Sequence, residues 1–343
     1  MAEVARLSGG PGAEIAPLAV ALGDPAGIGP EIVARAWASR NEGPLVPPFF
    51  AIGDRRSIAA VWDGPIETLS TPSDAASVYG RALPLIQVDD PGDIVPGDPN
   101  LAGARCALDS LEIAVGLART GSASGVVTGP VSKVQLYAIG FTYPGQTEFI
   151  AERCGLSAGN VVMMLAGPSL RTVPVTIHTA LADVPRALTT ELIVTRIRVA
   201  ARALQRDFGI EHPRLAVAGL NPHAGESGTL GREELDIIGP ALDTLRAEGL
   251  DIAGPMSADT MFHAEARARY DAAICMYHDQ ALIPIKTLDF NEGVNVTLGL
   301  PIVRTSPDHG TAFGIAGTGA ANPAATCAAI RLASECAARR AAS

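Results

Sequence analysis

The chain has 343 residues, of which 48% are apolar and 18% charged, so it can bury a large core and is too apolar for a disordered chain. At roughly 150 residues per domain, this length predicts about two domains. The net charge is −10 and aromatic residues make up only 4%. These values disfavour a nucleic-acid partner and an anionic membrane surface.

The five cysteines are scattered and form no Cys-x-x-Cys pair, which disfavours a disulfide framework or a thiolate zinc site and favours a reducing cytoplasm. The apolar stretch 15–22 follows Glu14 rather than a basic region. We therefore interpret it as a buried strand after a floppy leader of about a dozen residues, not as a signal peptide. No run approaches about 20 uninterrupted apolar residues, so no membrane span is expected.

Short apolar runs alternate with amphipathic stretches, which predicts an α/β architecture with a mostly parallel sheet. The expected strands occupy 17–22, 49–52, 125–128, 173–177, 214–220 and 271–277. The expected helices occupy 31–40, 101–119, 190–208, 233–247 and 322–340. Residues 57–100 contain six prolines and are expected to form a turn-rich surface region.

Polar motifs follow these strands at the point where each ends. They are GDPAGIGPE after 17–22, GPVSK after 125–128, His178 after 173–177, NPHAGE after 214–220 and YHDQ after 271–276. Ligands of open α/β sheets bind beyond the carboxyl ends of the strands, so these motifs are expected to meet in one crevice.

Three of the six histidines, His178, His223 and His278, each end a separate expected strand. Imidazole together with nearby carboxylates is a suitable donor set for zinc, manganese or a similar divalent ion. The pattern therefore fits a shared metal site, and it also fits three unrelated polar caps. His212 and His263 lie in segments expected to be exposed, and we expect neither to be functional.

Cations and glycine-rich segments leave further alternatives open. Lys286 and Arg304 lie in apolar contexts, where a cation usually reaches solvent or is paired. Alternatively, they form the local anion pocket that an acidic chain requires. The turn 23–31 is either a tight turn or a set of helix-start amides facing an anion. The stretch 308–323 is rich in small residues that allow close approach to a ligand, or it is a plain loop.

Several motifs occur in an order that resembles one known family. They are GDPAGIGPE, TGPVSK, GQTEF, LNPHAGE, ADTMF, YHDQALIPIK, VNVTLGLPIVRTSPDHGTAF and AGTGAANP. Over about residues 17–335 the chain resembles the 4-hydroxythreonine-4-phosphate dehydrogenase family of pyridoxal phosphate biosynthesis, distantly similar to isopropylmalate and isocitrate dehydrogenases. The resemblance implies two α/β/α domains with mostly parallel sheets around a central cleft. Residues 1–138 with 283–343 would bind NAD, and 139–282 would carry metal, substrate and dimer contacts.

The resemblance also implies an activity. It is the NAD-dependent and divalent-metal-dependent oxidation of 4-hydroxythreonine 4-phosphate to a 3-oxo acid, which decarboxylates to 3-amino-2-oxopropyl phosphate. A cytoplasmic homodimer with a shared active site would catalyse it. The metal (Zn, Mg, Mn or Co) would be bound by His178, His223 and His278. Asp259 and Lys286 would be catalytic, and the substrate would be bound by Gln146, Thr147, Lys286, Asn295 and Arg304. NAD would lie along His309, Gly310, Thr311, Gly317, Gly319 and Asn322.

One residue departs from the family pattern. The family motif reads Gly-His-Thr-Glu, whereas this chain has Gln146 in place of the histidine. A neutral hydrogen bond contributes about 1 kcal/mol and a charged one about 1.5–3 kcal/mol, so phosphate binding should weaken by about 1–2 kcal/mol. A related dehydrogenase acting on 4-phosphoerythronate, 4-phosphothreonate or a non-phosphorylated diol acid is therefore the alternative.

Overall fold

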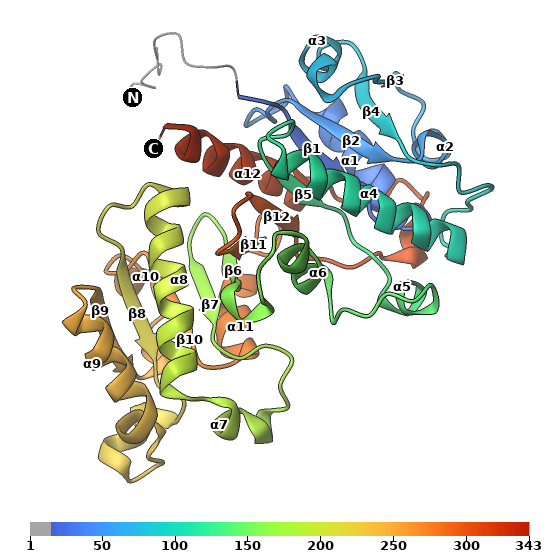
Figure 1. The fold of residues 1–343 in the computed structure, drawn as a ribbon. Coiled ribbons are helices and arrows are strands. Elements are labelled where there is room, and N and C mark those ends of the chain that lie inside the picture. The colour runs from blue at the N-terminus through green and yellow to red at the C-terminus, as the bar shows by residue number, and fades with distance from the viewer. Residues whose placement is uncertain (1–14, 343) are drawn as a thin grey trace.

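The computed structural model describes residues 15–342, and the expected leader lies outside the described residues. The chain forms two lobes that share one twelve-stranded sheet, in the order β3-β4-β2-β1-β5-β12-β11-β6-β7-β10-β8-β9 (Figure 1). Within the described part, the pairs β12–β11, β11–β6 and β6–β7 are antiparallel and the other neighbours are parallel. The predicted mostly parallel α/β fold class is confirmed.

The elements alternate along the chain. The strands are β1 (Leu18–Ala21), β2 (Phe49–Gly53), β3 (Ile66–Thr68), β4 (Leu83–Gln87), β5 (Val126–Thr128), β6 (Val162–Ala166), β7 (Arg171–Pro174), β8 (Arg214–Ala218), β9 (Asp251–Met256), β10 (Ala272–Cys275), β11 (Val294–Leu298) and β12 (Arg304–Pro307). The helices are α1 (Gly29–Ala38), α2 (Arg55–Ala59), α3 (Ala75–Tyr79), α4 (Leu101–Arg119), α5 (Lys133–Ala138), α6 (Gln146–Arg153), α7 (Val184–Ala187), α8 (Thr190–Phe208), α9 (Gly239–Ala247), α10 (Ala264–Arg267), α11 (His278–Asp289) and α12 (Ala324–Ala342). None of these helices is long and apolar enough to cross a membrane.

The region 57–100 differs from the prediction. It contains α3 and the strands β3 and β4, and the side chains of Leu83 and Leu85 in β4 are fully buried. The prediction of a turn-rich surface holds for residues 89–99, which are exposed or half-buried, but it was wrong for β4, where Pro84 interrupts the apolar pattern. A proline cannot donate to the ladder, yet the flanking leucines still pack into the core.

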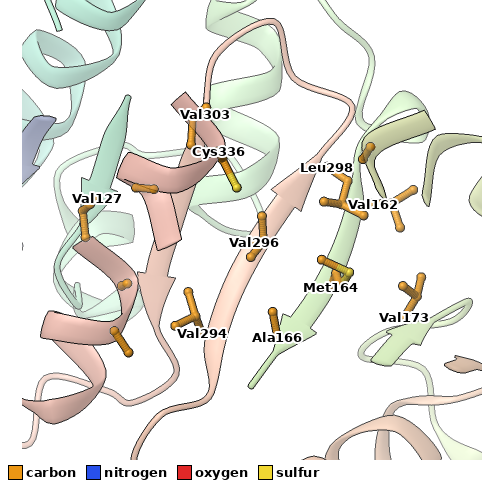
Figure 2. Close-up of a cluster of buried hydrophobic side chains, with 14 of the residues drawn as sticks. Val127, Val162, Met164, Ala166, Val173, Val294, Val296, Leu298, Val303 and Cys336 are labelled. Atoms are coloured by element: carbon orange, nitrogen blue, oxygen red, sulfur yellow. The ribbon is translucent and has the colours of Figure 1, made fainter. Parts of the chain in front are cut away.

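Strands β11 and β12 carry the sheet from one lobe to the other. Val294 and Val296 of β11 pack between Val127 of β5 and Met164 of β6, two strands from different lobes (Figure 2). The same cluster of buried residues extends over both lobes. The domain boundaries predicted above stay a prediction, and α11 runs across the proposed boundary at position 282.

A buried ion cluster joins α8 to α12 near this junction. The carboxylate of Asp207 accepts hydrogen bonds from Arg340 Nε at 2.7 Å and Arg206 Nε at 2.6 Å. Burial by itself raises the pKa of Asp207, but the two arginines outweigh it and hold the pKa below its ordinary value. Arg340 also donates to the carbonyl oxygen of Pro301. The C-terminal helix of one lobe is thereby fixed to a helix of the other.

Candidate active site

A cavity of about 520 Å³ lies between the lobes, beyond the carboxyl end of β5. It is lined by Thr128, Gly129, Pro130, Val131, Lys133, Leu136, Phe141, Gly145, Gln146, His178, Lys286, Asn295, Arg304, Ser306, Pro307, Asp308, His309 and Gly310. The expectation that motifs at strand ends meet in one crevice therefore holds for the GPVSK segment and His178. His223 is not among the lining residues.

Arg304 at the start of β12 is the cation most deeply placed in this cavity. Only 5% of the residue is exposed. Its guanidinium donates to Thr297 Oγ1 at 3.0 Å, Thr128 Oγ1 at 2.7 Å and Gln146 Oε1 at 3.2 Å. Burial lowers the pKa of Arg304 to about 10, so the group remains charged at neutral pH. The idea that this cation extends into solvent is wrong.

The partners of Arg304 are neutral. Within residues 15–342, no carboxylate forms an ion pair with it, although the Glu148 carboxylate interacts with it from farther away, and its Nε atom is buried without a hydrogen-bond partner. A buried charge without a counterion is costly unless an anion can approach it. Arg304 therefore gives the cavity the chemistry of an anion site, and its planar fork suits phosphate or carboxylate.

Gln146 and Thr147 lie in the first turn of α6. The Gln146 side chain donates to the carbonyl oxygen of Gly129 at 3.1 Å and accepts from Arg304, so it links two walls of the cavity. Thr147 is half-buried beside the cavity but is not among its lining residues. The amides at the start of α6 are oriented as helix N-termini are when they bind anions.

Lys286 on α11 and Asn295 on β11, the strand paired with β12, also line the cavity. The Lys286 Nζ atom lies 2.7 Å from Asp308 Oδ2, so this cation is paired. Sequence reasoning missed Asp308, although it directly precedes His309 in the DHGTAF motif. It also missed Thr128, which ends β5 and begins the TGPVSK motif.

His178 lines the cavity, and His278 lies close to it but outside the lining residues. Their ring centroids are 6.1 Å apart, and His278 Nδ1 lies 2.7 Å from Asp279 Oδ1, which leaves Nε2 as the free ring nitrogen. Partial burial, then Lys133 and His278, lower the pKa of His178. The lowered pKa favours the neutral imidazole, which is the form that binds metals. His178 has a left-handed φ of 53°, which sets the direction of its ring.

His223 lies elsewhere, in the 3-10 segment Pro222–Gly228. Its neighbour is Asp259, whose pKa is lowered mainly by a hydrogen bond from Ser257 and further by His223. Within residues 15–342, no three His, Cys, Asp or Glu side chains converge on a position that could hold a metal ion. The structure thus brings two of the three predicted ligands together in one chain, and the three-histidine site stays a prediction.

A second cavity of about 330 Å³ adjoins the first and shares Lys286, Asp308 and His309 with it. Among the predicted cofactor residues, His309 and Asn322 line this second cavity and Gly310 lines the first. Thr311 and Gly317 lie on the same loop, and Gly319 lines an adjacent groove with Asn322. The two cavities therefore meet at Lys286, Asp308 and His309.

Comparison with known proteins identifies the family to which this chain belongs. The family model described as "Pyridoxal phosphate biosynthetic protein PdxA" matches residues 47–333. The chain belongs to the PdxA family. The family expected from the ordered motifs is therefore confirmed.

Relatives within the PdxA family are similar along nearly the whole chain. A 4-hydroxythreonine-4-phosphate dehydrogenase from Zymomonas mobilis is 56% identical, covering 94% of this chain and 96% of the relative. One from Erythrobacter litoralis is 57% identical, covering 95% and 98%. Among solved structures, a 4-hydroxythreonine-4-phosphate dehydrogenase from Klebsiella pneumoniae has a TM-score of 0.83 at 35% identity, covering 94% and 99%. A terephthalate 1,2-cis-dihydrodiol dehydrogenase from Burkholderia xenovorans has a TM-score of 0.64 at 32% identity, covering 93% and 98%.

Proposed function

We propose that this chain oxidises the secondary alcohol of 4-hydroxythreonine 4-phosphate with NAD and a divalent metal ion. The alcohol loses a hydride to NAD and a proton to the surroundings, and the resulting 3-oxo acid releases carbon dioxide to give 3-amino-2-oxopropyl phosphate. The family membership and the names of the relatives support this reaction class. The observation that carries the proposal is the buried Arg304, which has no ion-pair partner among the described residues, in a cavity lined also by His178, whose ring lies beside that of His278.

The substrate phosphate would bind at the Arg304 side of the cavity. Arg304 supplies a guanidinium already aligned by three hydrogen bonds, and Asn295 supplies an amide from the neighbouring strand. The Lys286 ammonium would bind the phosphate as a point charge. Thr147 would contribute from the first turn of α6, where backbone amides favour anions. Asp308 would keep Lys286 directed toward the cavity when no phosphate is present.

His178 and His278 fit a divalent ion by their chemistry. Two rings at this separation can direct one nitrogen each to a shared ion, and the Asp279 carboxylate fixes the orientation of His278. When bound, the ion would supply Lewis-acid stabilisation of the alcohol oxygen. His223 and Asp259 lie outside the cavity-lining set, so we propose that they reach the site from a second copy of the chain. This is the homodimer expected above.

NAD would occupy the second cavity, along the loop that carries His309, Thr311, Gly317 and Asn322. Its nicotinamide end would meet the substrate near Lys286, which lines both cavities. We propose that the protein acts in the cytoplasm, where its cysteines would remain reduced; all five are free in the structure.

The alternative substrates differ in what they offer to Arg304 and Lys286. Gln146 favours weaker phosphate binding because its amide is neutral and is engaged with Gly129 and Arg304. A relative named for a non-phosphorylated dihydrodiol has the same fold at 32% identity. A four-carbon phosphorylated acid or a diol acid therefore remains the competing substrate class for this chain.

The test is a substrate screen with the purified protein. NADH formation is measured by absorbance with 4-hydroxythreonine 4-phosphate, 4-phosphoerythronate, 4-phosphothreonate and their dephosphorylated forms, with and without added metal. We expect the first compound to give the highest kcat/KM and to release carbon dioxide. Equal turnover of the dephosphorylated compound would contradict the phosphate site, and full activity after chelation would contradict the metal.

A further inference from the structure

Glu31 and Arg35 of α1 have no role in the proposed function, yet α1 and the turn before it contact the loop that would hold NAD. At one end of this loop, the Ile28 amide donates to the carbonyl oxygen of Thr311 at 3.0 Å. A Cβ atom on Gly27 would lie 3.0 Å from the same oxygen, so the approach is close. Asp24, which is 1% exposed, fixes the turn by accepting from the Ala26 amide at 3.0 Å. The turn is thus a buried support, not a set of amides open to an anion.

Helix α1 contacts the other end of the loop. Arg35 Nη1 donates to the carbonyl oxygens of Gly319 at 2.8 Å and Ala321 at 2.7 Å. Glu31 Oε1 accepts from the Ala321 amide at 3.3 Å and lies 3.4 Å from Arg35 Nη1. The two carbonyls use both hydrogens of that nitrogen, so the contact with Glu31 is ionic. These bonds are charge-assisted and directional.

The burial of Glu31 needs an explanation. Only 2% of the residue is exposed, and its Oε2 atom has no hydrogen-bond partner within the described residues. A buried carboxylate oxygen without a partner costs stability. The buried position is explained if the carboxylate stabilises the loop, because its other oxygen, Oε1, accepts from the Ala321 amide and lies next to Arg35 Nη1.

We infer that Glu31 and Arg35 are positioning residues for the dinucleotide, acting through the loop 311–321. With both ends held by α1 and its preceding turn, the loop is ordered before NAD binds. Less conformational entropy is then lost on binding. This inference rests on the proposed function, since it takes this loop as the NAD-binding segment.

The test compares Arg35→Ala with Arg40→Ala. Arg40 is a matched control because it also donates to two carbonyls, those of Trp37 at 2.9 Å and Gly80 at 2.8 Å, away from the loop. Amide hydrogen exchange of residues 317–321 is measured without ligand, and NADH binding is measured by fluorescence without substrate. Arg35→Ala should speed exchange and weaken NADH binding about tenfold, the equivalent of one charged hydrogen bond. Arg40→Ala should do neither.

Two further variants separate positioning from folding. Arg35→Lys keeps one charged donor and should restore part of the NADH affinity. Glu31→Gln keeps the acceptor for Ala321 and places an amide where the unpartnered oxygen lies, so it should fold and show a smaller loss than Arg35→Ala. In both, the KM for the phosphorylated substrate should stay within about twofold of the wild type, because the phosphate site is intact.

The outcomes are distinguishable. If the wild type binds NADH and Arg35→Ala matches Arg40→Ala in exchange and affinity, the inference is wrong and the proposed function stands. If the wild type binds neither NADH nor NADPH, the proposed function fails and the dinucleotide role of Glu31 and Arg35 fails with it.

Discussion

The two walls of the cavity are built differently. On the first wall, Arg304 is buried in the middle of the sheet and held by hydrogen bonds from three directions. On the second wall, His178 is exposed in a left-handed backbone conformation and His278 is half-buried at the start of α11. The third predicted ligand, His223, lies apart from both.

This difference shows which part of the candidate active site a single chain forms by itself. The wall that carries Arg304 is part of the core packing of β5, β11 and β12, so its charge is oriented before any ligand binds. A charge held in place in this way needs no reorganisation when a ligand reacts beside it. The histidine wall consists of loop ends and is completed, in our proposal, by a metal ion and a second copy of the chain. The variants below test this contrast.

The largest effect is expected from His223→Ala. If His223 is a metal ligand, turnover should fall by at least about 10³-fold, because the stabilised alkoxide is lost. The exposed position of His223 predicts an unchanged unfolding temperature. Turnover, bound metal by mass spectrometry and thermal unfolding are the measurements. His212→Ala, at another exposed histidine, is the control. Near-normal turnover of metal-depleted protein would contradict the proposal that these histidines bind a catalytic metal ion.

The next effect is expected from Arg304→Met, which keeps most of the volume and removes the charge. Because this removes about two charged hydrogen bonds to the phosphate, kcat/KM for the phosphorylated substrate should fall about 10²–10³-fold. Steady-state kinetics provide the measurement, and circular dichroism checks the fold. Unchanged kinetics would mean that the buried guanidinium is structural and that the first wall is not the phosphate site.

Lys286→Ala should act more weakly, because the ammonium is partly exposed and paired with Asp308. We expect KM for the phosphorylated substrate to rise about tenfold more than KM for its dephosphorylated analogue. Arg232→Ala is the control, since this exposed cation is also paired with an aspartate, Asp236, but does not line the cavity. A similar rise for both substrates would remove Lys286 from the phosphate site.

The smallest effect is expected from Gln146→His, which restores the residue of the family motif. A charged donor should lower KM for the phosphorylated substrate by up to about tenfold. The gain should be present at about pH 6 and lost at about pH 8, because an imidazole with an ordinary pKa near 6.5 is protonated only at the lower pH. A gain in affinity that does not vary with pH would show that the shape of the imidazole, and not its charge, lowers the KM of the variant.

Local signals were sufficient for the long helices. The helices α4 and α8 begin and end at the predicted residues, since Asn100 and Thr189 cap their first turns with side-chain hydrogen bonds and Gly209 ends α8 in a left-handed conformation. Strands β11 and β12 were not predicted. Their sequences, VNVTL and RTSP, contain several polar residues. They become strands by antiparallel pairing with each other, by antiparallel pairing of β11 with β6 and by parallel pairing of β12 with β5.

In the candidate site, too, some residues could be predicted from local sequence and others depend on the folded chain. Lys286 and Arg304 could be selected from the sequence because cations are rare in apolar runs of an acidic chain. Asp308 could not, since its role depends on an ion pair between α11 and the end of β12. Gln146 was noticed for its departure from a motif, whereas its hydrogen bonds to Gly129 and Arg304 are visible only in the folded chain.

By itself, the sequence determined the alternation of strands and helices, the family and the residue types that carry the chemistry, because these follow from local periodicity and ordered motifs. Only the tertiary structure decided that one sheet crosses both lobes, that Arg304 is buried without a counterion, and that His178 meets His278 while His223 lies with Asp259. Burial and the distance between residues far apart in sequence depend on packing of the whole chain, and no local pattern encodes them.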